Sequence, residues 1–170
     1  MIVEATAELI VESGVSGLTH RKIAARAGVP LSSTTQHFPS LLALRDAALD
    51  HLGSWIGEGV SGLAEDLAAA EDLPAVLGRV FFEYLSDPAR VRSDAAFYIV
   101  ATEDVELRPL ATHWFDALVE MLTPRVGVAA ARAVAVFGDG MSTYAMLHDG
   151  PLPEEELTRV FRLLLEDEDV

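Results

Sequence analysis

Cysteine is absent from this 170-residue sequence. A chain without cysteine forms no disulfide, has no thiolate nucleophile and offers no sulfur ligand to zinc. The remaining candidates for metal ligation, His113, His148 and Asp149, do not have the spacing of a known metal motif. We therefore expect neither a bound metal nor a cofactor.

Sequence motifs of enzymes are also missing. The chain contains neither HExxH nor G-x-S-x-G. Residues 57–62, GEGVSG, match G-x-G-x-x-G, but a dinucleotide site needs a preceding strand, and the residues before Gly57 have helical periodicity. These glycines instead predict either a bend in a long helix or an ordinary helix boundary. We predict that the chain is not an enzyme, and an all-α enzyme stays a third hypothesis without a motif.

Long apolar runs and a secretion signal are missing too. The first twenty residues contain Glu4, Glu8 and Glu12, where a signal peptide needs a basic start and an unbroken apolar core. No purely apolar run is long enough to span a bilayer. Hydrophobic residues at 51% and charged residues at 23% fit an ordered globular protein. We therefore predict a cytoplasmic protein without membrane contact.

Positive charge is scarce and unevenly placed. Twelve Lys and Arg stand against 27 Asp and Glu, for a net charge of -15. Residues 1–52 have a net charge of -1, whereas residues 53–170 have a net charge of -14. Three of the four basic residues of the first part lie between positions 21 and 26. Such asymmetry suggests two tasks in one chain, with a polyanion as a candidate partner of the first part.

What is present is helical periodicity along almost the whole chain. Gly14 and Gly28 stand where helices end, Thr19 is a candidate N-cap, and Asp72 and Asp87 each precede a proline. Pro109 fits either a first turn or a kink. We predict an all-α fold of about nine helices, over residues 2–13, 19–27, 31–38, 40–57 or onward to 70, 73–86, 88–102, 105–122, 127–148 and 153–165.

Residues 19–38 have the pattern of a helix-turn-helix, in which two helices cross through a short turn. Ala24 and Gly28 supply the small residue and the turn glycine. In the second helix, Leu31, Thr34 and Phe38 fall on the predicted buried side. Donors and acceptors on the other side suit base edges in a major groove. The DNA-binding candidates are Thr19, His20, Arg21, Lys22, Ser32, Ser33, Thr35, Gln36 and His37, and Arg26 is expected to help hold phosphates.

The stretch from IVEATAELIVESG through LTHRKIAARAGVPLSSTTQHFPSLLALRDAAL resembles the DNA-binding domain of TetR-family transcriptional regulators. The resemblance covers about the first 50 residues, and the I-A-x-x-A-G-V core followed by HF-P-S carries most of it. It implies a helix-turn-helix domain, here residues 1–46, and a ligand-binding and dimerisation domain, here residues 47–170. It also implies an Ω-shaped homodimer with one recognition helix per subunit.

Three positions depart from the family pattern. Thr35 and Gln36 stand where members commonly have an aromatic residue that touches a phosphate. Leu41 stands where a lysine is common, and the sequence as given begins at the first helix, ahead of which many members have a short basic arm. Phosphate contacts supply much of the affinity for DNA. We therefore expect weaker and more salt-sensitive DNA binding than that of a fully basic member.

Aromatic and apolar side chains after residue 54 are candidates for a small-molecule pocket, because such pockets are mostly apolar with a few polar tips. The ligand-binding candidates are Trp55, Phe82, Phe97, Tyr98, Trp114, Phe137, Met141 and Tyr144. The same stripe fits an ordinary core, and both interpretations stay open. Acids near such a pocket, for example Glu103 or Asp116, would favour a cationic ligand.

Two helices near the C-terminus predict a homodimer interface. Small residues between 129 and 140 permit close approach of residues 127–148 to another helix, and residues 153–165 present Leu157, Val160, Phe161 and Leu164. Our leading hypothesis is a ligand-responsive DNA-binding transcriptional regulator, a repressor that acts as a homodimer on a palindromic operator. The alternative is a helical small-molecule-binding or protein-interaction module of the same architecture with weak or no operator binding.

Overall fold

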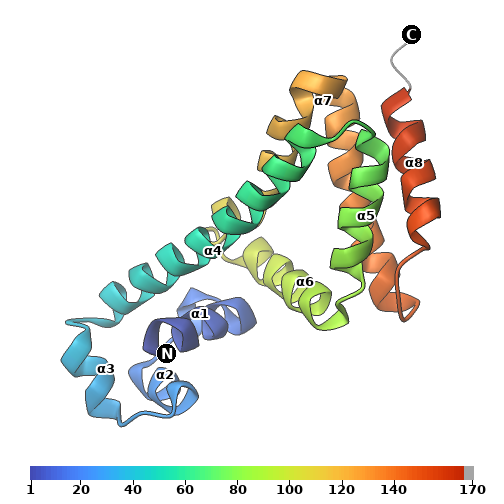
Figure 1. Cartoon of the computed structure of the whole chain (residues 1–170). Helices are drawn as coiled ribbons and strands as arrows, with labels where there is room; N and C mark the ends of the chain where they lie inside the picture. Colours follow the sequence, from blue (N-terminus) through green and yellow to red (C-terminus); the bar gives the residue numbers. More distant parts are fainter. Residues whose placement is uncertain (167–170) are drawn as a thin grey trace. The chain divides into compact units, whose positions relative to one another are not determined.

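The structure, a computed structural model, describes residues 1–166, and the side chains of these except residues 55, 56, 58, 59 and 166. This described part contains eight α-helices, one short 3-10 helix and no strand, which confirms the all-α prediction (Figure 1). The elements are α1 (Ile2–Ser13), η1 (Val15–Gly17), α2 (His20–Ala27), α3 (Leu31–His37), α4 (Leu41–Ala69), α5 (Leu73–Leu85), α6 (Pro88–Glu103), α7 (Arg108–Leu147) and α8 (Glu154–Glu166).

The helix ends follow local chemistry. The Thr19 hydroxyl accepts a hydrogen bond from the Lys22 backbone N–H at 3.2 Å, which caps α2. Gly28 ends α2 at φ 65° and ψ 30°, a left-handed conformation that glycine adopts without steric cost. The Asp72 carboxylate caps α5 by accepting from the Ala75 N–H at 3.2 Å. These caps and the turn glycine can be predicted from the sequence, because the interacting groups lie within one helical turn.

Two predicted boundaries differ from the structure. α4 continues through Gly57 and Gly59 to Ala69, so the alternative of a helix boundary at these glycines was wrong. A glycine weakens a helix by about 1 kcal/mol relative to alanine without breaking it, and buried Leu63 and Leu67 anchor the following turns. α7 joins the two helices predicted at 105–122 and 127–148, and Gly127, at φ 76°, interrupts the helical backbone between them.

The described chain divides into two compact units that do not follow chain order. Unit 1 comprises residues 1–58 and 96–112, and unit 2 comprises residues 59–95 and 113–170. The end of α6 and the start of α7 therefore pack with the N-terminal helices. The predicted division into domains at residues 46 and 47 stays a prediction.

Each unit has its own apolar core. In unit 1, Ile10, Ile23, Leu44 and Leu107 are fully buried. The four come from α1, α2, α4 and the residues just before α7, so burial of one cluster fixes all four segments.

In unit 2, α5 and α8 lie side by side (Figure 1). Gly78 permits this, because a Cβ at that position would collide with Thr158 of α8. The rings of Phe81 and Phe161 lie 5.1 Å apart between their centroids, and Phe161 is fully buried. α8 is thus a core helix on its inner face.

α7 is the one helix among the described residues that is long and apolar enough, by length and composition alone, to cross a membrane. Its most apolar 18-residue window has a mean hydropathy of 1.2, and 33% of that window is buried within the chain. Leu118, Leu122 and Val134 of α7 lie in the core of unit 2. We interpret α7 as a core helix, which passes the same length and composition test.

Candidate nucleic-acid interface

The turn between α2 and α3 is held by backbone contacts and by a small buried face. Ile23 and Ala24 of α2 are buried. The Val29 N–H donates to the Ala24 carbonyl oxygen at 3.0 Å, across the left-handed Gly28. α2 and α3 therefore have the short turn that a helix-turn-helix requires.

Thr34 anchors α3 to α2 through its hydroxyl. This residue is fully buried, and its Oγ1 donates to the Leu31 carbonyl oxygen at 2.8 Å. The same oxygen lies 3.1 Å from Nδ1 of His20. Because the only hydroxyl proton goes to Leu31, Nδ1 of His20 must be the donor in the second bond. His20, predicted to contact DNA, is thus half-buried and positions α3, with Nε2 as its remaining polar atom.

The outward side of α3 matches the predicted set with one exception. Ser32, Thr35, Gln36 and His37 are exposed, whereas Ser33 is half-buried. The prediction that Leu31 is buried was wrong, because 50% of its surface is exposed. It is the first residue of α3, and helical side chains lean toward the N-terminus, so Leu31 points past the end of the helix instead of onto α2.

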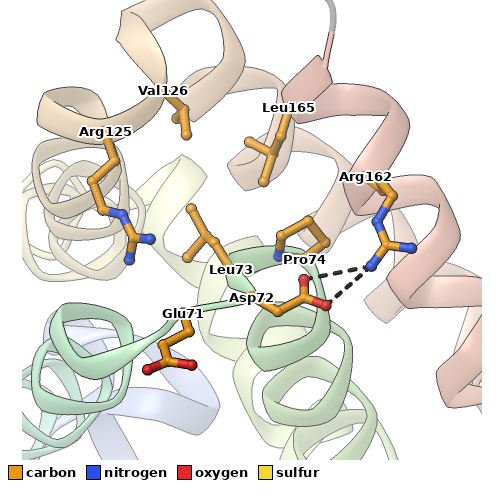
Figure 2. Close-up of a pocket in the computed structure, with 8 residues that line it drawn as sticks. All are labelled: Glu71, Asp72, Leu73, Pro74, Arg125, Val126, Arg162 and Leu165. Atoms are coloured by element: carbon orange, nitrogen blue, oxygen red, sulfur yellow. Dashed lines mark hydrogen bonds and ion pairs between the residues drawn. The ribbon is translucent and has the colours of Figure 1, made fainter.

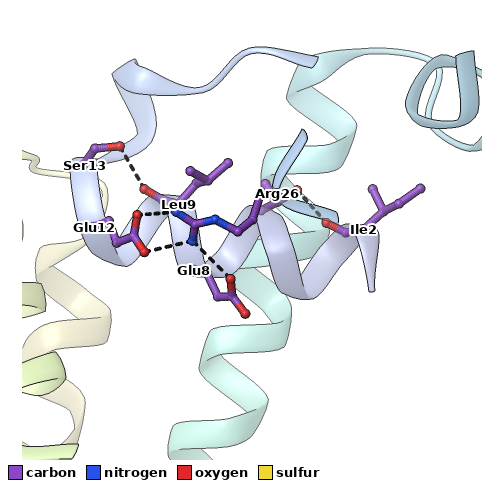
Figure 3. A network of polar contacts seen from close by, with 7 residues as sticks. Ile2, Glu8, Leu9, Glu12, Ser13 and Arg26 are labelled. Carbon is purple, nitrogen blue, oxygen red and sulfur yellow. Dashed lines mark hydrogen bonds and ion pairs between the residues drawn. The ribbon is translucent and has the colours of Figure 1, made fainter. Parts of the chain in front are cut away.

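Most cations near α2 are engaged inside unit 1. Arg26 donates to Glu12 at 2.6 and 2.8 Å and to Glu8 at 3.1 Å (Figure 3). The hydrogen bonds from Arg26 lower the pKa of Glu12, and the two acids raise the pKa of Arg26. Arg26 was expected to help hold phosphates, yet its guanidinium is already paired with two carboxylates. This pairing crosses from α1 to α2, and helix periodicity does not reveal it.

The other basic side chains of unit 1 differ in availability. The Lys22 ammonium donates to the Gly17 carbonyl oxygen at 2.8 Å. Arg45 bonds Asp46 at 2.7 Å and Glu106 at 3.0 Å, and the hydrogen bond to Asp46 raises the pKa of Arg45. Arg21 is exposed and has no ion pair within the described part of the chain. Of the predicted phosphate contacts, Arg21 is thus the most accessible.

Asp104 fastens the turn after α6 to the N-terminal helices. Its carboxylate accepts from the Val15 N–H at 3.0 Å and from the Glu106 N–H at 3.1 Å. Glu106 in turn pairs with Arg45 of α4. Residues 96–112 are therefore bonded to both ends of the helix-turn-helix unit. Sequence analysis missed Asp104, since its main partner is 89 residues away.

The predicted ligand-binding side chains do not all come together. Phe82, Trp114, Phe137 and Tyr144 are half-buried and Met141 is buried, all in the apolar cluster of unit 2. Phe97, which is buried, and Tyr98 belong to the core cluster of unit 1. The side chain of Trp55 lies outside the described residues. Of the seven candidates whose side chains are described, five share one cluster.

Asp94 is a half-buried acid that sequence analysis did not single out. It accepts a hydrogen bond from the Tyr84 hydroxyl at 2.9 Å, and the Arg90 guanidinium lies 5.2 Å from the Tyr84 ring centroid. Burial raises the pKa of Asp94, while the bond from Tyr84 and the charge of Arg90 act in the opposite direction. Glu103 and Asp116, which the sequence suggested instead, are both exposed. The sequence did not single out Asp94, because no local pattern distinguishes it from the other acids among the 27.

An open hollow of about 490 Å³ lies elsewhere in unit 2 (Figure 2). The Arg125 guanidinium at its rim donates to the carbonyl oxygens of Leu67 and Ala70 at the end of α4. An ion pair of 3.1 Å joins Arg162 to Asp72. None of the predicted ligand-binding side chains that the structure describes lines the hollow, whose described residues are Glu71, Asp72, Leu73, Pro74, Arg125, Val126, Arg162 and Leu165.

The helices predicted for dimerisation are used partly inside the chain. Leu157 and Phe161 of α8 are fully buried in unit 2 without any partner chain. Several small residues of α7 also face the core, namely Ala130, Ala131, Ala135 and Gly138. The expectation that Leu157 and Phe161 face a second subunit was therefore wrong, because the apolar side of α8 points inward. Surface left for a partner lies on the outer faces of these helices.

Comparison with known proteins places this architecture in a family. Residues 2–48 match the sequence profile of the bacterial regulatory proteins of the tetR family. The chain is 33% identical to the multidrug binding protein EbrR in its complex with malachite green, with a TM-score of 0.74 over 96% of this chain and 95% of that one. No curated protein sequence matches the chain.

A second solved structure agrees over the whole length. The TetR-family member SCO1917 from Streptomyces coelicolor A3 is 34% identical, with a TM-score of 0.74, and the match covers 96% of this chain and 95% of that one. EbrR complexed with ethidium is 33% identical at a TM-score of 0.67, over 96% of each chain. Known members of this family are regulators and not enzymes. The chain belongs to the TetR family, with the fold of a ligand-responsive DNA-binding transcriptional regulator.

Proposed function

We propose that this protein is a cytoplasmic, homodimeric repressor that binds a palindromic operator through the outward side of α3. The observation that carries this proposal is the exposed set Ser32, Thr35 and Gln36 on a helix fixed by buried Thr34. Hydroxyl and amide groups read base edges by hydrogen bonding without a formal charge. Base readout and phosphate affinity are separable, so a neutral recognition helix is compatible with an operator.

Phosphate contacts in this proposal come from few groups. Arg21 and Lys22 lie in the first turn of α2, where backbone N–H groups also attract anions. Arg26 contributes little while Glu8 and Glu12 hold it. Each phosphate contact contributes a salt slope of about -0.9. With few contacts the salt dependence of operator binding should be shallow for a TetR-family member, contrary to the more salt-sensitive binding expected from the sequence.

Selection of random duplex DNA at low salt tests this function. A palindromic sequence should be enriched, with half-sites about one helical turn apart, roughly 34 to 36 Å. Gln36→Ala should abolish or alter the enriched sequence, whereas Ser93→Ala, an exposed change in unit 2, should leave it as it is. Failure to enrich any palindrome would overturn the proposal.

For the effector we propose an aromatic cation. EbrR was crystallised with malachite green and with ethidium, both of which are aromatic cations. In this chain the half-buried Asp94 carboxylate beside Tyr84 is suited to such a charge, and Phe82 and Trp114 in the same unit suit aromatic rings. Ethidium fluorescence should rise on titration with the parent protein, and Asp94→Asn should weaken that binding about tenfold or more.

The alternative is a helical ligand-binding module without an operator. The pairing of Arg26 and Arg45 with acids and the net charge of -15 favour it. The double substitution Arg21→Glu with Lys22→Glu separates the two functions. A DNA-binding regulator loses affinity and salt slope, while ethidium binding is unchanged. A module of the alternative kind shows no DNA binding in either form.

A further inference from the structure

The outward face of the second half of α7 is not covered by any other element in the described part of the chain. Residues spaced by one turn along it are exposed, among them Val128 at 47%, Val136 at 61% and Leu147 at 76%. Arg132, Asp139 and Thr143 complete the same stripe, because their spacing of three or four residues keeps them on one side of a helix. Exposed apolar side chains that lie singly are normal on a protein surface, so the charged residues of this row decide what the face can bind.

The stripe contains one positive and one negative side chain, Arg132 and Asp139. Neither has a hydrogen bond or an ion pair within the described part of the chain. Arg79, Arg125 and Arg162 of unit 2 are bonded to carboxylates or carbonyl oxygens, whereas Arg92 and Arg159, like Arg132, have no such bond within the described residues. Arg132 and Asp139 are seven residues apart, which is two turns or about 10.5 Å along the axis. Their midpoint falls next to Val136.

Two glycines of α7 differ in what requires them. Gly138 faces inward, and a Cβ there would collide with the ring of Phe81. Gly140 is exposed, and a Cβ there would meet nothing within 4 Å. A helical glycine costs about 1 kcal/mol relative to alanine. Packing against Phe81 explains why residue 138 is a glycine, but no described contact explains the glycine at position 140. A second helix packed close to this face would account for Gly140.

We propose that this face packs against the same face of a second copy, antiparallel about a two-fold axis near Val136, so that Arg132 of each subunit pairs with the partner's Asp139. The proposal rests on the homodimer of the proposed function and adds which residues decide that the chain pairs with itself. A two-fold interface is reciprocal, so a charge at one position must meet its complement at the mirrored position. Arg132 lies about one turn before Val136, and Asp139 lies about one turn after it. A two-fold axis near Val136 therefore brings Arg132 of each subunit to Asp139 of the other, so that two such pairs form.

The surroundings of Asp139 agree with this arrangement. Asp139 is exposed, yet the atoms around its carboxyl group remove part of its hydration and raise its pKa, and no group in the described part of the chain offsets that effect. A guanidinium from a second subunit would stabilise the charged carboxylate. The flanking residues Val136 and Thr143 are apolar or small enough to pack around such a pair.

Charge reversal tests the pairing, with sedimentation equilibrium as the measurement. The R132D chain has acids at both positions, and the D139R chain has arginines at both. Each reversal creates two like-charge contacts per dimer, so the dimer dissociation constant of either variant alone should rise by about 100-fold or more. An equimolar mixture should form heterodimers with nearly the parent affinity, and the double variant R132D/D139R should dimerise with itself again.

Matched controls separate this effect from net charge and from misfolding. Arg92→Asp and Glu120→Arg make the same charge changes at exposed positions off the stripe and should leave dimerisation as in the parent. Gly140→Leu should weaken the dimer while the monomer keeps its helical circular dichroism, because a Cβ at this exposed position meets no described atom within 4 Å.

The outcomes distinguish this pairing from the homodimer itself. A parent protein that is monomeric at micromolar concentration overturns the homodimer of the proposed function. A dimeric parent whose R132D and D139R variants also dimerise with parent affinity leaves the homodimer standing and overturns the pairing. Reversals that weaken the dimer without recovery in the mixture or in the double variant overturn it as well.

Discussion

The helix-turn-helix surface of unit 1 and the outer face of α7 in unit 2 use charge in opposite ways. In unit 1, Arg26 and Arg45 are each bonded to two acids of the same chain. On α7, Arg132 and Asp139 have no partner within the described residues. Whether a charged side chain can bind another molecule thus depends on which residues of its own chain lie next to it in space. The formal net charge of -15 describes neither surface.

The inner and outer faces of α8 give the largest expected contrast. Phe161→Ala removes a fully buried ring that packs against Phe81 and Phe137, and should lower the free energy of unfolding by about 3–5 kcal/mol. Leu163→Ala, at a position 63% exposed, should change it by less than about 0.5 kcal/mol. Urea denaturation followed by circular dichroism measures both. Equal effects of the two substitutions would show that α8 does not bury the side that carries Phe161.

The hydroxyl of Thr34 tests how far unit 1 depends on internal polar contacts. Thr34→Val keeps the shape but leaves Nδ1 of His20 and the Leu31 carbonyl oxygen without this partner, so we expect a loss of about 1–3 kcal/mol in unfolding free energy. Thr35→Val, on the exposed side of the same helix, is the matched control. A stable Thr34→Val protein that still binds DNA like the parent would contradict the anchoring role.

Removing the acidic partners of Arg26 should leave its guanidinium unpaired, as Arg132 is on the outer face of α7. With Glu8→Gln and Glu12→Gln combined, the guanidinium loses both charged partners and can reach a phosphate (Figure 3). We expect tighter DNA binding and a salt slope steeper by about 0.9 for one new contact. Glu65→Gln with Glu120→Gln makes the same change in net charge in unit 2. If that control increases the slope equally, total charge and not Arg26 is responsible.

The smallest expected effect concerns Asp94, whose pKa burial raises. A carboxyl with a raised pKa in the folded state binds its proton more tightly there than in the unfolded chain. Its contribution to stability is therefore complete below the unfolded pKa and is lost as pH rises through the folded pKa.

Asp94→Asn should flatten this part of the pH profile of unfolding free energy. Tyr84→Phe should steepen it, because the hydrogen bond from Tyr84 opposes the shift. Denaturant melts between pH 4 and pH 7 give the profile. A profile that steepens in Asp94→Asn would contradict a raised pKa of Asp94 in the folded protein.

Where sequence prediction succeeded, the signal was local. The Thr19 cap, the left-handed Gly28 and the Asp72 cap each depend on residues within one turn, so they were legible along the chain. The helix-turn-helix pattern is also local, since its contacts span fewer than twenty residues. The family followed from that pattern and was confirmed by the comparisons.

Where sequence prediction failed, the contacts joined separate elements of the fold. Asp104, in the turn after α6, bonds Val15 of η1, and Arg26 of α2 bonds Glu12 of α1. Membership of Phe97 and Tyr98 in the core cluster of unit 1 depends on residues 96–112 packing with the N-terminal helices. A helical wheel gives the side on which a residue lies, but not which helix covers that side.

The amino-acid sequence by itself determined the all-α class, the helix-turn-helix and the family, because helix periodicity, caps and turn glycines act over a few residues. Only the tertiary structure decided which charges are free. It paired Arg26 and Arg45, left Arg21, Arg132 and Asp139 open within the described part of the chain, and buried Leu157 and Phe161. The physical reason is that ion pairing and burial depend on distances in space, which the packing of whole helices sets.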